Sequence, residues 1–174
     1  MVIAETPRLS LRHLRHDDAV AMNAVFGDPE VMLFGDGVRD PEWVTFWIAK
    51  WLNEYYPRWQ FGAWAVVDKG STTVIGYCGL SRFPERCSDV EAELGFRLAR
   101  PYWGRGLATE AATAVRDHAF AVLGVPRLIA HIDPANVGSL HVVAKLGMRY
   151  ARDVMLPGYD HPDHVYAIDR TERT

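Results

Sequence analysis

The sequence contains few cysteines, and this scarcity limits the kind of protein it encodes. Only Cys78 and Cys87 occur among 174 residues, whereas a secreted domain held by disulfides usually has more. We interpret them as two reduced thiols, although their spacing leaves a bridge between them open. A chain of this length can bury a full core without disulfides or metals, since folding removes roughly 70% of the unfolded surface.

Long hydrophobic runs are also missing, which argues against a membrane protein. No apolar stretch approaches the ~20 residues that a membrane-spanning helix needs. Residues 1–15 lack the basic head and the following apolar run of a signal peptide. We therefore expect a cytoplasmic protein without a membrane partner.

The chain has no excess of positive charge. Its 19 Lys and Arg residues stand against 22 Asp and Glu residues, which gives a formal net charge of -3. Because this balance produces no broad positive field, we expect no nucleic-acid partner. The mild acidity is compatible with an amine or cationic substrate, but it excludes few other ligands.

No linker, repeat or low-complexity segment divides the chain, so we predict one domain over residues 1–174. Apolar–polar alternation predicts strands, and apolar residues at three- and four-residue steps predict helices. Strands are predicted at 8–14, 61–67, 74–83, 90–98, 128–132, 148–156 and 165–168. Helices are predicted from Asp17 or Asp18 to Phe26, from Asp40 to Pro57, from Ala108 to Gly124 and from Asn136 to Gly147. This order favours an α/β (α+β) fold with a mixed sheet flanked by helices.

A glycine turn follows the predicted strand at 90–98. Gly104 and Gly106 are separated by one residue, so the backbone can turn tightly and approach a ligand. Free N–H groups at the helix start, the helix dipole and the nearby Arg105 together predict an anion site. No lysine follows the glycines, which excludes a P-loop, and Thr109 stands where a dinucleotide motif needs a small residue. A plain tight turn is the alternative.

A second motif, at residues 136–148, follows the glycine turn after one more predicted strand, at 128–132. Asn136 can cap this helix and Gly147 can end it, and both roles are ordinary. Combined with the segments at 5–12, 75–80, 92–98 and 103–111, this segment at 136–148 gives the chain an ordered set of motifs. The set resembles the GNAT superfamily of acetyl-coenzyme A-dependent N-acetyltransferases. Its ribosomal-protein N-terminal (alanine/serine) acetyltransferase branch is the most similar.

The resemblance covers nearly the whole chain and implies a GNAT-type, largely antiparallel sheet with helices on both faces. It also implies acetyl-CoA as cosubstrate, held through its pyrophosphate by Trp103, Gly104, Arg105, Gly106, Leu107, Ala108 and Thr109. The backbone of Phe96, Arg97 and Leu98 would pair with the pantetheine arm. Asn136 and Ser139 would lie beside the pantetheine and its sulfur. Trp103 departs from the family pattern, which has Arg or Gln there, so one polar contact is lost while the backbone donors remain.

The implied reaction needs an uncharged amine, and a primary amine is mostly protonated at pH 7. A group must therefore accept a proton. By the resemblance, Glu93 is the first candidate, as the base or as the anchor of the ammonium. Its apolar neighbours predict a dry surrounding and a raised carboxyl pKa. Two alternatives remain: Glu93 is a structural carboxylate, or Glu91 or a water chain takes its place.

The leaving thiolate also needs a proton. Many superfamily members have a tyrosine seven residues after the asparagine, where this chain has Val143. Ser139 is the nearest hydroxyl by position and is predicted to donate to the sulfur. Since the thiolate of coenzyme A is a fair leaving group, protonation by water is the alternative.

The acceptor is not fixed by a fold-level likeness. The branch favours a protein N-terminal α-amine. An amino acid, a polyamine or an aminoglycoside-like amine is the alternative, and so is a non-catalytic acyl-CoA sensor. A homodimer is left open.

Two further groups of residues attract attention without fitting a firm pattern. The segment His161-Pro162-Asp163-His164 and the pair His13 and His16 do not match a zinc signature, so we predict no metal. The aromatic residues Trp43, Phe46, Trp47 and Trp51 are more typical of core packing than of a ligand site. A substrate-facing role for part of them is the alternative.

Overall fold

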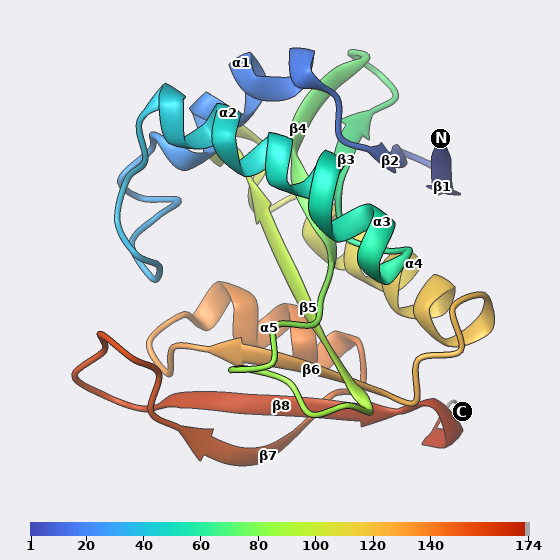
Figure 1. Cartoon of the computed structure of the whole chain (residues 1–174), viewed down its shortest axis with the longest axis vertical. Coiled ribbons are helices and arrows are strands. Elements are labelled where there is room, and N and C mark those ends of the chain that lie inside the picture. Colours follow the sequence, from blue (N-terminus) through green and yellow to red (C-terminus); the bar gives the residue numbers. More distant parts are fainter. Residues whose placement is uncertain (173–174) are drawn as a thin grey trace.

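The computed structural model describes residues 1–172, in which eight strands form one mixed sheet (Figure 1). The strands are β1 (Val2–Glu5), β2 (Leu9–His13), β3 (Ala63–Asp68), β4 (Thr73–Ser81), β5 (Glu91–Leu98), β6 (Arg127–Ile132), β7 (Arg149–Val154) and β8 (Asp163–Asp169). Their order in the sheet is β1-β2-β3-β4-β5-β6-β8-β7. Every neighbouring pair is antiparallel except β5 and β6, which are parallel. The predicted mixed, largely antiparallel sheet is confirmed.

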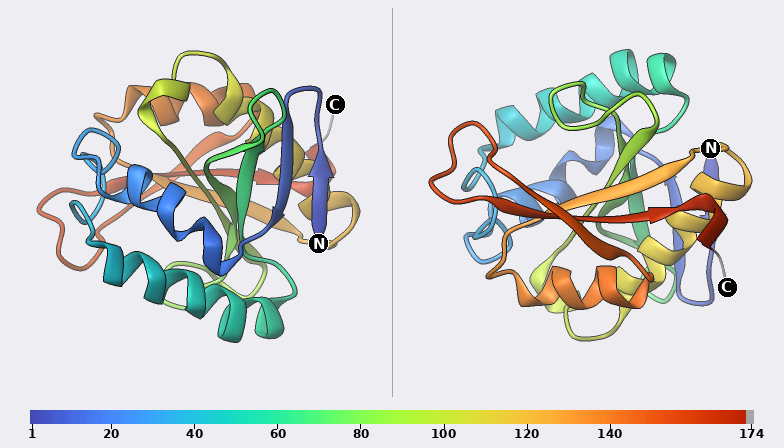
Figure 2. Two further views of the ribbon diagram at one scale, coloured as in Figure 1. Left: turned by 90° about the horizontal axis from the view of Figure 1, so that it is seen from above. Right: turned by 90° about the horizontal axis from the view of Figure 1, so that it is seen from below.

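Helices cover both faces of the sheet, as predicted (Figure 2). The helices are α1 (Ala19–Phe26), α2 (Pro41–Lys50), α3 (Tyr56–Trp59), α4 (Leu107–Ala121) and α5 (Val137–Lys145). The first three lie on one face, while α4 and α5 lie on the other. Within residues 1–172, no helix combines the length and the apolar character that crossing a bilayer requires.

The predicted end of the second helix is wrong. Pro57 lacks an N–H donor and its ring crowds the carbonyl four residues earlier, so it was expected to stop the helix. Instead, α2 continues through one π-helical turn, Trp51–Tyr55, into α3. The wider π turn accommodates the proline. The helix ends at Gln60, which adopts a left-handed conformation with φ of 60°.

Two other details at the N-terminal end differ from the prediction. Strand β1 was missed because it is a short, partly exposed edge strand without clear alternation. The Asp18 carboxylate does not cap α1; it accepts a hydrogen bond from the Arg15 N–H and pairs with Arg12. In contrast, Asp40 caps α2 as predicted, since its carboxylate accepts from the Trp43 N–H at 2.7 Å.

The core lies between the sheet and the helices. The apolar face of α4 is fully buried, with Ala111, Ala112, Val115 and Ala119 at 0% exposure. Their three- and four-residue spacing explains why this helix was visible in the sequence. Cys78 and Cys87 are free and buried, in agreement with two reduced thiols.

The parallel pair is the feature that positions the site. Strands β5 and β6 pair only from Glu91↔Arg127 to Glu93↔Ile129. Beyond this point the two strands separate, as Figure 1 shows. Residues 94–98 of β5 remain paired with β4 on their other side. The sheet therefore separates along one edge of β5, between a part formed by β1 to β5 and a part formed by β6, β8 and β7.

Candidate active site

A cavity of about 1060 Å³ occupies the opening between β5 and β6. Nearly every residue predicted for the site lines it. These residues are Glu93, Phe96, Arg97, Leu98, Trp103, Gly104, Gly106, Leu107, Ala108, Thr109, Asn136 and Ser139. The exception is Arg105, whose guanidinium lies 5.6 Å from the ring centre of Tyr102 and is not part of the lining. The fold thus brings together strand, turn and helix residues that are far apart in the sequence.

The glycine turn leaves room for a ligand at the start of α4. Gly104 and Gly106 have φ values of +70° and +75°, a region that favours glycine. A Cβ on Gly104 would meet nothing within 4 Å, and one on Gly106 would meet only the end of Arg8 at 3.6 Å. Helix α4 begins at Leu107 without a side-chain cap. Its first N–H groups therefore face an open space that suits a pyrophosphate.

Side-chain hydrogen bonds stabilise the glycine turn. The Arg8 guanidinium donates to the Arg105 carbonyl at 2.8 Å and to the Glu110 carboxylate at 2.6 Å. Thr6 donates to the other oxygen of Glu110 at 2.6 Å. Trp103 donates from its indole N–H to the Leu98 carbonyl at 2.7 Å. The tryptophan that departs from the family pattern thus fastens the turn to β5.

The separated edge of β5 offers a second binding element. Within residues 1–172, no strand lies beside this edge after Glu93. Apart from the Leu98 carbonyl, which accepts from Trp103, its backbone groups are available to an extended ligand. A Cβ on Gly95 would meet nothing within 4 Å, which leaves the approach to the strand free. The edge and the glycine turn together fit the arm and the pyrophosphate of coenzyme A.

Helix α5 brings a hydroxyl to the cavity. The Asn136 side chain accepts a hydrogen bond from the Ser139 N–H at 3.1 Å and caps the helix, so the ordinary role of this asparagine is confirmed. Both residues also line the cavity. Val143 is fully buried in the core, so the position at which the family resemblance implies a tyrosine carries no hydroxyl.

Glu93 is held by two partners that the sequence analysis missed. Arg86, in the segment 82–90, donates to both carboxylate oxygens at 2.8 and 2.7 Å. His131 on β6 is 1% exposed, and its Nδ1 lies 3.2 Å from Oε1. Burial alone would raise the pKa of Glu93, but His131 and Arg86 outweigh it and lower the pKa below its ordinary value. The prediction of a raised pKa is therefore wrong.

The reserve candidate, Glu91, lies outside the cavity lining. Its carboxylate accepts from the Ser88 N–H at 3.0 Å and lies 3.5 Å from Arg127 and 3.7 Å from Arg152. Its side chain is 7% exposed. These contacts make Glu91 a structural carboxylate and remove it as an alternative base.

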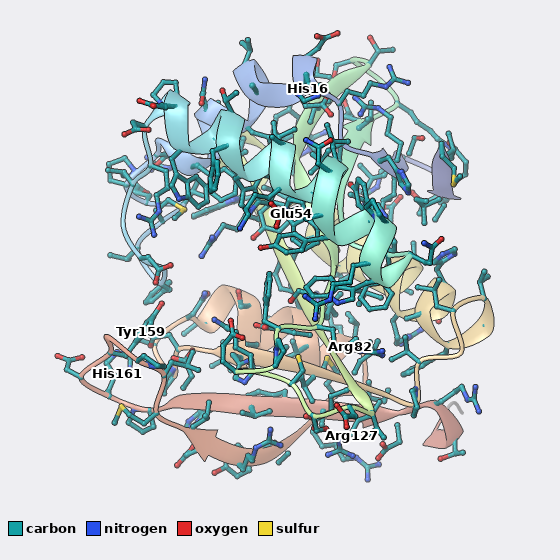
Figure 3. All side chains as sticks on the ribbon, viewed as in Figure 1. His16, Glu54, Arg82, Arg127, Tyr159 and His161 are labelled. Carbon is teal, nitrogen blue, oxygen red and sulfur yellow. The ribbon has the colours of Figure 1, made fainter. Side chains whose placement is uncertain are left out.

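Two loops meet beside the cavity. Tyr159, labelled in Figure 3, lies in the segment 155–162 between β7 and β8. Its hydroxyl donates to Asp36 in the segment 27–40 at 2.9 Å. Both residues line the cavity. The hydrogen bond therefore links two segments of the cavity lining that are far apart in the sequence.

The histidines considered as metal ligands in the sequence analysis contact other side chains. Over the described chain, no group of three or more His, Cys, Asp and Glu side chains could hold a metal ion. His13 stacks on Tyr56 with ring centres 4.2 Å apart. His161 lies 3.4 Å from Asp133 through Nε2.

Aromatic side chains form one wall of the cavity. They are Trp43, Phe46, Trp47, Trp51, Tyr55, Tyr77 and Phe83. Several also pack on one another, as Trp47 does on Trp51 at 6.0 Å between ring centres. These side chains therefore belong both to the packing of α2 and to the cavity surface.

Comparisons with known proteins agree on one family. The sequence model described as "Acetyltransferase (GNAT) domain" matches residues 8–149. The uncharacterized protein YkkB of Bacillus subtilis strain 168 is 31% identical over 151 residues, which cover 86% of each chain. The crystal structure of a GNAT-family acetyltransferase from Bacillus anthracis superposes with a TM-score of 0.83 at 26% identity, covering 99% of this chain and 100% of that one. The [Ribosomal protein uS5]-alanine N-acetyltransferase of Escherichia coli strain K12 is 27% identical over 117 residues, which cover 66% of this chain and 60% of that protein.

Proposed function

The chain belongs to the GNAT family and is an acetyl-CoA-dependent N-acetyltransferase, and we propose that it acetylates a primary amine presented between Glu93 and the start of α5. One observation carries this proposal. A single cavity is lined at one place by the glycine turn and at another by the Glu93 carboxylate. An anion site and an ammonium site in one cavity suit a reaction between an acyl-CoA and an amine.

The residues that would hold acetyl-CoA follow from the open spaces described above. The first N–H groups of α4 and the turn at Gly104 and Gly106 would bind the pyrophosphate. The free edge of β5 at Phe96, Arg97 and Leu98 would pair with the pantetheine arm. When bound, acetyl-CoA supplies the acetyl group as a thioester.

Glu93 would bind the incoming amine. Its lowered pKa keeps the carboxylate ionised at neutral pH, which favours an ammonium but weakens the carboxylate as a base. Arg86 and His131 fix its orientation through contacts at 2.7 and 3.2 Å. We therefore assign Glu93 first to anchoring the amine and second to accepting its proton on the way to solvent.

Ser139 would assist the departure of the thiolate. It lies in the first turn of α5, where the helix dipole favours negative charge. Its backbone N–H is used by the cap, and its hydroxyl is a donor of the type that a leaving sulfur needs. The helix dipole and the Ser139 hydroxyl would therefore both stabilise the negative charge on the leaving sulfur.

Two acceptor classes follow from different observations. The likeness to a uS5-alanine N-acetyltransferase supports a protein N-terminal α-amine. The Tyr159–Asp36 hydrogen bond, which links two segments of the cavity lining, and the aromatic side chains of that lining support a small amine.

Thiol release from acetyl-CoA, measured with a panel of small amines and of peptides with free N-termini, tests the function and separates the two classes. Turnover on small amines alone supports the second class, and turnover on peptides alone supports the first. Tight coenzyme A binding with no turnover on any amine would contradict catalysis and favour a sensor.

A further inference from the structure

Asp163 is a buried carboxylate with an unused oxygen. It is the first residue of β8, it is 7% exposed, and it lines the cavity. Its Oδ1 accepts no hydrogen bond from any residue in the described range 1–172. Burying such an oxygen without a donor is costly, because its lost hydration is not replaced. The atom therefore indicates a donor that arrives with a ligand.

A second carboxylate lies next to it. Strands β6 and β8 pair up to Ile132↔His164. The next residues are Asp163, which begins β8, and Asp133, which directly follows β6. Burial and the charge of Asp133 raise the pKa of Asp163. Asp133 also lines the cavity. Two adjacent carboxylates thus share one region of the cavity surface.

The positive groups around Asp163 are already engaged. Arg86 and the two histidines His131 and His161 act on Asp163 in the direction that lowers its pKa, but they do not offset its burial. The Arg86 guanidinium is bound to Glu93. His161 lies 3.4 Å from Asp133 rather than on the free oxygen.

We propose that Asp163 and Asp133 form a subsite for a second positive charge on the acceptor amine. This inference rests on the proposed function and specifies its substrate class. A cationic nitrogen can donate to the free Oδ1 of Asp163 and favours the ionised carboxylate, in a charge-assisted hydrogen bond. The acceptor is then a primary amine that carries another ammonium a short distance away, such as an α,ω-diamine.

Strand geometry sets the spacing of the two anionic positions. The Glu93 carboxylate lies 3.2 Å from Nδ1 of His131. Asp133 directly follows β6 and lies two residues after His131, and two extended residues span about 7 Å. A short diamine can therefore place one nitrogen at Glu93 and the other at Asp163.

The first test uses the native protein and a matched pair of amines, 1,4-diaminobutane and 1-aminobutane. We expect kcat/KM to be about 10- to 100-fold higher for the diamine, as for a charge-assisted contact with a buried carboxylate. Calorimetry without acetyl-CoA measures the same preference as a ratio of Kd values. Equal acetylation and equal binding of the two amines would overturn the subsite and leave the proposed function intact. Preferential binding of the diamine without acetylation of either amine would support the subsite and contradict the function.

The second test removes the charge of the subsite. In Asp163→Asn the preference should disappear through a higher KM for the diamine, while kcat/KM for 1-aminobutane stays within a few-fold. Asp160→Asn is the matched control, because this carboxylate is 98% exposed, three residues away, and outside the cavity lining. It should keep the preference. Loss of the preference in both variants, or its retention in Asp163→Asn, would overturn the assignment.

Asp133→Asn gives an independent variant if Asp163→Asn does not fold. The Asp133 carboxylate accepts from the Ala135 N–H at 2.7 Å, and an asparagine oxygen can keep this bond. We expect a smaller reduction in the preference for the diamine. An unchanged preference would exclude Asp133 from the subsite.

Discussion

Arg86 holds both carboxylate oxygens of Glu93: its Nε donates to Oε2 at 2.8 Å, and its Nη2 donates to Oε1 at 2.7 Å. Paired hydrogen bonds of this kind fix the plane of a carboxylate as well as its charge. The guanidinium comes from the segment 82–90 and not from the strand that carries Glu93. The orientation of the proposed amine anchor therefore depends on a loop.

Removing the charge of Glu93 should reduce catalysis. Glu93→Gln keeps the shape of the side chain, and we expect kcat/KM to fall by about 10²–10⁴-fold, as for a group that positions the amine or accepts its proton. The measurement is kcat/KM against pH for both proteins. Glu54→Gln, at a side chain that is 57% exposed, controls for a change of net charge. A Glu93→Gln profile within a few-fold of the native one would make Glu93 a structural carboxylate.

Removing Arg86 should shift the pH dependence. With His131 and Arg86 present, Glu93 has a pKa below its ordinary value and is ionised at neutral pH. His131 and Arg86 both lower the pKa of Glu93 against the effect of burial, and Arg86→Gln removes one of these two partners. The pKa therefore rises, and the acidic limb of kcat/KM moves to higher pH.

Arg82→Gln is the control for this shift, since Arg82 lies in the same loop but donates to the Glu91 carbonyl at 2.9 Å. The pKa of Glu93 is lower in the folded protein than in the unfolded chain, where it is about 4.3. Its ionisation therefore stabilises the native fold at pH values above the unfolded pKa, and this contribution is lost as the pH falls through the folded pKa. An acidic limb that does not move in Arg86→Gln would exclude this control of Glu93.

Helices and strands were predicted from the sequence more accurately than contacts between side chains. The α4 face and the cap at Asp40 were visible because period and capping are local properties. Strand β1 was missed because an exposed edge strand needs no strict alternation. Pro57 was misjudged because the π turn that relieves it has no local signature.

The contacts of Glu93 could be identified only from the three-dimensional structure. Its contact with His131 depends on the register Glu93↔Ile129 between strands that are far apart in the chain. The apolar neighbours Ala92 and Leu94 suggested a dry carboxylate, but they point to the opposite face of β5. A strand prediction gives this alternation, whereas it does not give the side chains that face Glu93 from a loop and from β6.

Ser139→Ala should separate chemistry from binding. We expect kcat to fall by up to about 10²-fold if the hydroxyl protonates the thiolate, with little change in the Kd of coenzyme A. The backbone N–H of residue 139 still reaches Asn136 in this variant, so the cap remains and thermal stability should not change. An unchanged kcat, with chemistry shown to limit the rate, would remove Ser139 from the mechanism.

In contrast to Ser139→Ala, Asn136→Ala should lower the stability of the protein. It removes the cap of α5, and the free energy of unfolding should fall by about 0.5–2 kcal/mol. Urea denaturation measures this difference. Asn136→Asp keeps an oxygen for the Ser139 N–H and should retain most of the stability. Equal losses in the two variants would show that the cap is not what Asn136 contributes.

Two glycines at opposite ends of α4 give a matched test of the anion site. Gly106 and Gly124 have φ values of +75° and +66°, and a Cβ on either would meet one arginine nitrogen at 3.6 Å. Gly106→Val and Gly124→Val should therefore lose similar stability, since a branched residue is strained in this region. Only Gly106 lines the cavity, so only Gly106→Val should raise the Kd of coenzyme A, by about 10-fold or more, equivalent to roughly 1.4 kcal/mol. Calorimetry on the two folded variants decides the matter: equal, native-like affinities would reject the glycine turn as the pyrophosphate site, and an equal loss in both would attribute the effect to strain in α4.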